Sequence, residues 1–169
     1  IYLEQGDVKP EQLHAPFEEA LREGHLVPIC FVSARTHTNH EQSVGIKEFL
    51  KVLAELAPNP TEGNPPVFVN GTGPDAKQTA VALDPAKPAV AHVFKVVNDR
   101  FGKQGVFRVH QGVVKKDSQL IIGSAKKPIR VAHVYKLQGS QTIEIDAAVP
   151  GDIAAVVKVD EVHFDSVLH

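Results

Sequence analysis

The chain has 169 residues, of which 43% are hydrophobic, 22% charged and 6% aromatic, and its formal net charge at pH 7 is -2. A globular chain of this length buries about 70% of its surface, enough for one good core or two small ones. No run reaches the roughly 20 apolar residues of a membrane span. The near-zero net charge excludes a strongly basic protein that coats nucleic acid along its length. A local basic patch is still compatible with this net charge.

The sequence also indicates a compartment and an origin. It has one cysteine, Cys30, which excludes an intramolecular disulfide and favours a reducing cytoplasm. Cys30 lies in an apolar run, where a thiolate is disfavoured, so a structural core thiol is the better interpretation than a nucleophile. The sequence begins at Ile1, contains no methionine and shows no signal-peptide pattern. We therefore expect a fragment or a processed chain.

Residues 1–57 carry the pattern helix, strand, helix, which is the close of an α/β unit. The first helix is predicted to begin at Pro16 and to end at a cap formed by Gly24. Residues 26–32 are short, apolar and partly β-branched, which predicts a strand buried on both faces. Apolar residues at helical spacing predict the second helix over residues 46–56. A single strand cannot stand alone, because it has no sheet to join.

The composition and the hydrophobic periodicity change at two points further along the chain. Residues 58–88 hold seven of the twelve prolines and are predicted to be a linker, with short extended pieces at 67–69 and 79–83. From residue 89 onward, short runs with strand periodicity and intervening turn signals predict a small antiparallel β-barrel. The expected strands cover residues 90–97, 105–110, 119–122, 129–135, 142–145 and 153–159.

Charge divides this β region. Residues 100–136 hold nine Lys or Arg and a single acid, Asp117, whereas residues 137–169 hold one Lys and six acids. The basic side chains would contact phosphates without reading sequence, with an affinity that weakens steeply with salt. A solvated hairpin face is the open alternative. The candidate nucleic-acid-binding residues are Arg108, Lys115, Lys116, Lys126, Lys127 and Arg130.

Three other patterns carry little chemistry. Residues Gly71–Ala76 match the dinucleotide fingerprint by letters, but no helix is expected after them to bind a pyrophosphate, so a flexible turn is the better interpretation. His37, His40 and Glu41 lack a third His or Cys partner, and a polar loop is favoured over a metal site. Ser33 lacks the Gly-x-Ser-x-Gly elbow, which leaves a small hydrolase as a remote possibility.

The end of the predicted strand 26–32 is more informative. Two small residues, Ser33 and Ala34, follow it and precede a loop. In α/β sheets ligands bind at the carboxyl ends of strands, and small side chains there let backbone amides approach a flat ligand. A plain strand-to-loop junction has the same pattern.

Several segments together resemble a known family. Val32-Ser33-Ala34 is followed by a loop and by Gly45-Ile46 at a helix start, and that helix ends with Leu56-Ala-Pro-Asn-Pro60. The segments Gly105–Gly112 and Gly151–Val156 resemble the patterns Phe-x-Arg-Val-x-x-Gly and Gly-Asp-Ile/Leu-x-Ala-Val. In their order and spacing these pieces are similar to the middle of bacterial elongation factor G, or of an elongation factor G-like paralogue, over essentially the whole chain.

The resemblance implies a domain organisation. Residues 1–57 would be the carboxyl-terminal end of the GTP-binding domain, 58–88 a linker and 89–169 domain II. The fold class is then an α/β fragment followed by an all-β translation-factor antiparallel β-barrel. In the family this barrel packs on the GTPase domain and touches the RNA of the small ribosomal subunit, which gives the basic residues a candidate partner.

The resemblance also implies roles for single residues. Ser33, Ala34 and Arg35 would form the last guanine-recognition motif, in which backbone amides meet the base. Gly112 and Gly151 would be turn glycines. The implied barrel core residues are Phe94, Val109, Ile153 and Val156.

Other family motifs are absent, because the region that would carry them precedes Ile1. These are the phosphate loop, the magnesium-linked Asp-x-x-Gly and the guanine-reading Asn-Lys-x-Asp. GTP and Mg²⁺ are therefore expected in the parent protein and not on this fragment, which should not hydrolyse GTP. Arg35, the loop 36–40 that follows it and the segment 162–165, where Thr-Gly-Asp is usual, depart from the family and favour a paralogue.

The alternatives are of two kinds. Within the family, the parent could be a ribosome-protection or release-factor GTPase. From another class, the chain could be a stand-alone RNA- or protein-binding β-barrel module with no enzymatic activity.

Overall fold

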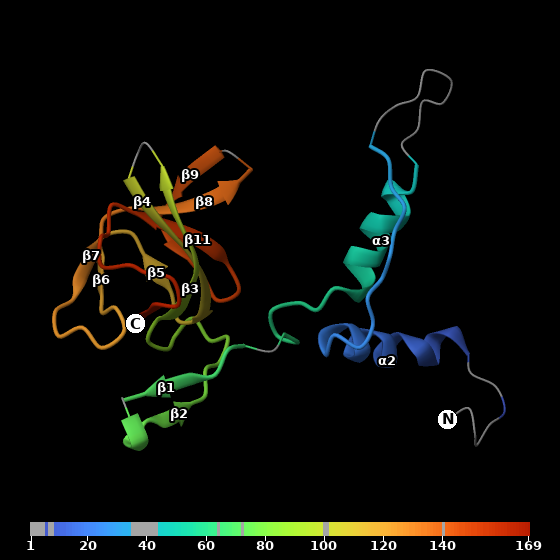
Figure 1. Ribbon diagram of the computed structural model, residues 1–169, viewed down its shortest axis with the longest axis horizontal. Helices are drawn as coiled ribbons and strands as arrows, with labels where there is room; N and C mark the ends of the chain where they lie inside the picture. Colours follow the sequence, from blue (N-terminus) through green and yellow to red (C-terminus); the bar gives the residue numbers. More distant parts are fainter. Residues whose placement is uncertain are drawn as a thin grey trace. The chain divides into compact units, whose positions relative to one another are not determined.

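The structure is a computed structural model, and it describes residues 6, 9–34, 44–63, 65–71, 73–99, 102–139 and 141–169. The chain divides into two compact units, Ile1–Asn64 and Pro65–His169, and each is described by itself. The first unit holds the helices α2 and α3, and the second holds the strands β1 to β12 (Figure 1). No described helix has the length and apolar character needed to cross a membrane.

Helix α2 spans Pro10–Arg22, so it begins six residues earlier than the predicted start at Pro16. A proline is well placed in the first turn because its missing N–H has no intrahelical partner there, and Pro10 fills that position. The Lys9 N–H donates to the Gln12 side chain at 3.0 Å, which caps the helix start. Gly24 follows the last turn with a φ of 76°, so its predicted capping role is confirmed.

Helix α3 spans Ile46–Leu56, as predicted. It starts after Gly45, whose φ is 71° and whose Cα lies so close to the chain before it that a Cβ would collide with the Phe31 carbonyl oxygen. Its apolar residues recur at helical spacing, yet none of its residues is buried, and Leu50 and Leu53 are exposed. The apolar face of α3 is therefore incompletely covered within the described part of its unit.

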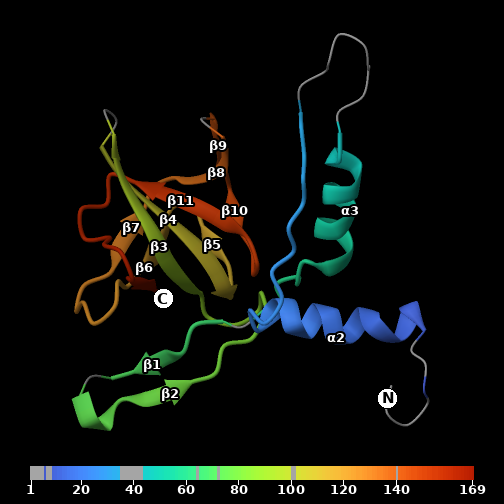
Figure 2. The same cartoon turned by 45° about the vertical axis from the view of Figure 1, so that its right-hand side comes forward.

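The segment between the two helices differs from the prediction. Residues 26–32 are extended, but the prediction of a strand buried on both faces is wrong, since Val27, Ile29 and Phe31 are 76%, 79% and 88% exposed. No backbone hydrogen bond joins residues 27–32 to another described residue. Figure 2 shows this segment (blue) as an unpaired trace beside α3. A doubly buried strand needs a neighbour on each edge and a layer on each face, and the described residues of this unit supply neither.

Cys30 lies on this segment as well. The thiol is half-buried and not in a core, so the predicted structural core thiol is not what the structure shows. Cys30 is not in a core for the same reason that residues 26–32 are not buried: the described residues of this unit provide no neighbouring strands for the apolar run around Cys30.

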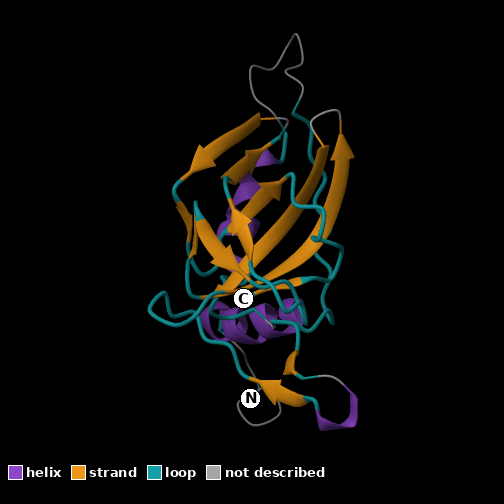
Figure 3. Cartoon of the chain, turned by 90° about the vertical axis from the view of Figure 1, so that its left-hand side faces the viewer, coloured by secondary structure: helices purple, strands orange, loops and turns teal. Residues whose placement is uncertain are grey.

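The second unit begins with a hairpin of β1 (Phe68–Asn70) and β2 (Lys77–Thr79), joined through the short 3-10 helix η1 (Gly73–Asp75). It continues as mainly antiparallel β-structure, which confirms the antiparallel β character predicted for this region (Figure 3). Closure of the strands into a barrel stays a prediction. The largest sheet has the strand order β12-β3-β4-β11-β8-β9. Its strands are β12 (Val167–Leu168), β3 (Val90–Asp99), β4 (Gly102–Gln111), β11 (Ile153–Val157), β8 (Val134–Gln138) and β9 (Gln141–Ile145).

Two further ribbons accompany this sheet. In one, β5 (Val114–Lys115) pairs with β10 (Ala147–Ala148); in the other, β6 (Ser118–Leu120) pairs with β7 (Ile129–Val131). The predicted strand 129–135 is thus split between β7 and β8. Strands β5, β10 and β12 are two residues long and were not predicted, because two residues are too few to show a period.

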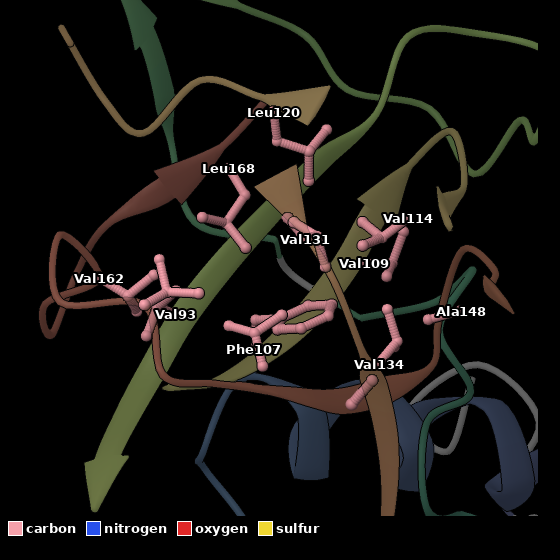
Figure 4. Packing of buried hydrophobic residues seen from close by; sticks show 14 of the residues in the cluster. Val93, Phe107, Val109, Val114, Leu120, Val131, Val134, Ala148, Val162 and Leu168 are labelled. Atoms are coloured by element: carbon pink, nitrogen blue, oxygen red, sulfur yellow. The ribbon is translucent and has the colours of Figure 1, made fainter. Parts of the chain in front are cut away.

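One apolar core lies inside the second unit (Figure 4). The largest side chains with almost no exposed surface come from strands distributed over the unit and, in the case of Val162, from the segment between β11 and β12. They are Phe107, Leu168, Val93, Val109, Val114, Val131, Val134, Val156 and Val162. The core positions expected for Val109 and Val156 are therefore confirmed.

Two expected core residues lie elsewhere. Phe94 is 39% exposed because it follows the buried Val93, so strand alternation points it to the opposite face, and the register shift between Val93 and Lys95 leaves it without a partner on β4. Ile153 is 51% exposed because it pairs with Arg108, on the face of the sheet opposite to that of the buried Phe107. The predictions for these two residues are therefore wrong.

The two predicted turn glycines are confirmed. Gly112 and Gly151 have φ values of 65° and 96°. At Gly112 a Cβ would also lie 2.6 Å from the Ala89 backbone, so both conformation and space require glycine there.

Candidate functional site

The first candidate site is the end of the extended segment 26–32. The Ser33 N–H donates to the Val44 carbonyl at 2.9 Å, and the Val44 N–H donates back to the Ser33 carbonyl at 3.1 Å. The main chain of Ser33 is therefore engaged with the residue before Gly45. Ala34 follows as an exposed residue, and Arg35 lies outside the described residues. Nothing in this geometry tests a role in binding a base.

The weaker sequence patterns fall in two places. His37, His40 and Glu41 lie outside the described residues, and among the residues that the structure describes no group of three potential ligands is placed to hold a metal. Gly71–Ala76 forms the tip of the β1–β2 hairpin and includes η1. A turn was the favoured interpretation, and a turn is what the described residues of this segment form.

Three of the six candidate basic residues gather around one turn. Lys115 ends β5, Lys116 begins the turn that leads to β6, and Arg130 lies on β7, which pairs with β6. Asp117 occupies the turn with a φ of 61°, and its N–H donates to the Val131 carbonyl at 2.7 Å. Its carboxylate accepts a hydrogen bond from Arg130 Nη2 at 2.9 Å, which joins the β6 side of the ribbon to β7 at the end where the turn lies.

A second acid lies beside the same turn. Glu144, on β9, forms an ion pair with Lys116, and its Oε1 lies 2.9 Å from His133 Nδ1. The hydrogen bond and charge of Glu144 raise the pKa of Lys116, while Lys116 and then His133 hold the pKa of Glu144 below its usual value. Both groups therefore stay charged near neutral pH, and part of the positive charge at this turn is matched by carboxylates.

The remaining candidates lie elsewhere. Lys126 and Lys127 are exposed on the loop between β6 and β7, at the opposite end of that ribbon from Asp117. No ion pair joins either of them to another described residue. Arg108 lies on β4 of the large sheet, directly opposite His92 of β3. The six residues thus occupy three places, and contact with nucleic acid stays a prediction for each of them.

Sequence analysis missed one cluster of rings on the large sheet. His92 and His110 lie on the neighbouring strands β3 and β4, with ring centroids 6.4 Å apart, and Phe68 from β1 packs edge-on against both. His92 Nε2 lies 2.8 Å from Oδ1 of Asp165, which has a φ of 66°. The only available sequence signal was a pair of histidines inside predicted strands, since Phe68 and Asp165 come from distant segments.

The environment of His110 changes its chemistry. The residue is 9% exposed, and burial, followed by the charges of Arg108 and His92, lowers the pKa of His110 to about 4. His110 is therefore neutral at physiological pH. Because a neutral imidazole packs well against an aromatic ring, this protonation state suits the contact with Phe68.

Comparison with known proteins gives a consistent result. The family model described as Elongation factor G domain 2 matches residues 88–166. Elongation factor G of Rhodopirellula baltica is 26% identical over 160 residues, which cover 95% of this chain and 22% of that protein. Elongation factor G 1 of Methylococcus capsulatus is 29% identical over 118 residues, which cover 70% of this chain and 17% of that protein.

A solved structure agrees with these relatives. A crystal structure of a protein from Thermus thermophilus is 28% identical and superimposes with a TM-score of 0.61. The match covers 99% of this chain and 21% of the other. The chain thus spans about a fifth of the length of the proteins it is similar to.

Proposed function

Residues 88–166 of this chain form an elongation factor G-like domain II module related to translational GTPases, and from this premise we propose that the chain is part of an elongation factor G-like translational GTPase. In this proposal residues 1–57 are the end of the GTP-binding domain, 58–88 a linker and 89–169 domain II. One observation carries it: the similarity to Rhodopirellula elongation factor G covers 95% of the chain and so runs through both units.

The first unit supports the proposal. Its segment 27–32 has exposed apolar side chains and no backbone partner among the described residues, and the apolar face of α3 is also incompletely covered. A parallel sheet of a GTP-binding domain would pair with both edges of such a strand and would bury its two faces. Those strands would come from elsewhere in the parent protein.

GTP and Mg²⁺ are proposed as ligands of the parent protein. The β module itself lacks a catalytic GTPase site, and the sequence contains no phosphate-loop pattern. Ser33, Ala34 and Arg35 would supply one corner of the guanine pocket. Since the Ser33 amide is engaged with Val44, the amides offered to the base would be those that follow it.

Calorimetric titration with GTP tests this role. The chain alone is expected to show no detectable affinity, and a version extended upstream by the parent's own sequence is expected to bind with micromolar affinity or better. In the extended version Ala34→Val should crowd the base and weaken binding about tenfold or more. Ala57→Val, at an exposed residue after α3, is the matched control. An extended version without GTP affinity contradicts the proposal.

The second unit is proposed to close as the translation-factor antiparallel β-barrel and to contact small-subunit ribosomal RNA in the cytoplasm. The exposed Lys126 and Lys127 are the best-placed contacts, because neither is matched by an acid among the described residues. Lys115 is likewise exposed, with no acid paired to it among the described residues. Acids accompany Lys116 and Arg130, and Arg108 is half-buried on β4, so these three would take secondary roles.

A salt series tests the RNA contact. A plot of log affinity for structured RNA against log salt concentration should have a steep negative slope for the unmodified chain. In the double variant Lys126→Gln/Lys127→Gln the magnitude of this slope should fall by roughly 1 for each phosphate contact that is lost. The control Lys47→Gln/Lys51→Gln removes the same charge from exposed positions of α3. A flat plot for the unmodified chain, or equal effects of the two pairs, contradicts the contact.

A free-standing β module that binds RNA or protein is the second candidate. The observation in its favour is that the second unit contains a complete apolar core of its own. The calorimetry separates the two proposals, since GTP binding by the extended version is expected only for the GTPase.

A further inference from the structure

A single buried side chain fixes the β1–β2 hairpin to the rest of its unit. Phe68 is 8% exposed, and no other described residue between 65 and 80 is buried. Val67 and Val69, on either side of it, are exposed, as is every residue of β2. Phe68 is also not part of the main core cluster. The hairpin is a two-stranded sheet of its own, so it can move away from the large sheet without disturbing that core.

Phe68 covers a basic strip on the large sheet. Its ring centroid lies 5.2 Å from that of His110 and 6.5 Å from that of His92. Arg108 is directly opposite His92 in the register of β3 and β4, and it lies two residues before His110, close enough for its charge to act on that ring. Three side chains that can carry positive charge are therefore neighbours under and beside one aromatic ring.

The charges around His110 disfavour its protonated form while Phe68 covers the ring. Arg108 on β4 and His92 on β3 face it, and both disfavour a charged His110. Asp165, in the turn before β12, faces His92 and accepts its hydrogen bond at 2.8 Å. With Phe68 in place His110 is buried and neutral, whereas without it the ring would meet water and could hold a proton beside Arg108.

We propose that the β1–β2 hairpin is a gate, whose release uncovers a site for phosphate groups formed by Arg108, His92 and His110. An Arg guanidinium presents paired N–H donors that match phosphate oxygens, and the two imidazole rings beside it offer further N–H donors. The assignment of RNA as the source of the phosphates rests on the proposed function.

The gate is weakly held. Full burial of one Phe side chain favours the closed state by a factor on the order of 10 to 100, so the open state is a minor population that a bound anion can enrich. Phosphate binding and hairpin closure are mutually exclusive, because Phe68 and the anion would occupy the same place over His110. Each therefore weakens the other.

The test uses the full chain with Phe68→Ala, which removes the anchor, and Val69→Ala, which truncates an exposed neighbour on the same strand. NMR titration should show the pKa of His110 rising from about 4 towards 6.5 in Phe68→Ala and unchanged in Val69→Ala. Phe68→Leu keeps an apolar cover and should fall between the two. If the pKa of His110 is the same in all four proteins, the hairpin does not cover this site and the proposal is wrong.

Binding supplies the second readout. At pH 6, inorganic pyrophosphate should bind Phe68→Ala about tenfold or more tightly than the unmodified chain, and Arg108→Gln in the Phe68→Ala background should abolish the gain. No gain, or a gain that survives Arg108→Gln, overturns the proposal. If a short RNA duplex also binds Phe68→Ala more tightly and loses this gain with Arg108→Gln, RNA is supported as the source of the phosphates. If only pyrophosphate shows the gain, the phosphate site is supported and RNA is excluded as its ligand. Neither result depends on GTP affinity, so failure of the GTPase proposal is separately visible.

Discussion

Stability of the second unit should depend on pH through His110. The pKa of this ring is about 4 in the folded chain and near 6.5 in the unfolded chain, because burial and the charges of Arg108 and His92 disfavour the imidazolium. Between pH 6.5 and about pH 4, the His110 ring is protonated in the unfolded chain but stays neutral in the folded chain. Stability from the neutral ring is thus fully present above pH 6.5, falls as the pH drops, and is lost below about pH 4.

The size of the effect follows from the two pKa values. Each pH unit between them changes the free energy of unfolding by about 1.4 kcal/mol, so the loss between pH 7.5 and pH 5 is about 2 kcal/mol. The measurement is urea unfolding at several pH values, followed by Tyr135 fluorescence in a Tyr2→Phe background so that the signal comes from β8 alone. His110→Gln keeps a polar side chain that does not titrate, and it should remove this loss.

The comparison between variants isolates His110 from other titrating groups. His25→Gln, in the first unit and exposed, is the control and should keep the pH dependence of the unmodified chain. If His110→Gln loses as much stability as the unmodified chain between pH 7.5 and pH 5, the ring is not held neutral by its surroundings and the reasoning is refuted.

Three further outcomes are expected. Phe107→Ala should cost about 3–5 kcal/mol in urea unfolding, because its ring is fully buried in the core, and a cost below about 1 kcal/mol would contradict that packing. Gly112→Ala should cost more than Gly123→Ala, since both have positive φ but only Gly112 has backbone 2.6 Å from the new Cβ, and equal costs would argue against the clash. Glu144→Gln should lower the pKa of Lys116 towards its usual value in an NMR titration, and no change would show that the ion pair does not form in solution.

Periodic segments of the fold could be predicted from the sequence, and their surroundings could not. Helix α3 matches its prediction because its apolar spacing and the following proline act locally. Residues 26–32 are extended as predicted, but their burial depends on neighbouring strands, which no local pattern guarantees. Phe94 and Ile153 illustrate a second limit. A register shift of one residue moves a side chain to another face, and the register is set by the partner strand.

The candidate sites show the same division. The excess of basic residues in the middle of the β region was visible in the sequence, and so was their position on strands and turns. Their partners were not, because Arg130 pairs with an acid 13 residues away and Lys116 with one on β9. The contact of His92 with Asp165 joins residues 73 positions apart, and only the closure of β12 onto β3 creates it.

The unpaired extended segment has a practical consequence for handling the protein. Proteases bind their substrates as extended chains with accessible main-chain groups, and residues 27–32 already have that form. The Phe31 side chain is exposed, so it is accessible to an enzyme that cleaves after aromatic residues. The strands of the second unit, by contrast, are hydrogen-bonded to one another. Chymotrypsin should therefore nick the chain at Phe31 first and leave a resistant carboxyl-terminal product, so a shorter band in an ageing sample would report on this segment before any loss of the β-structure.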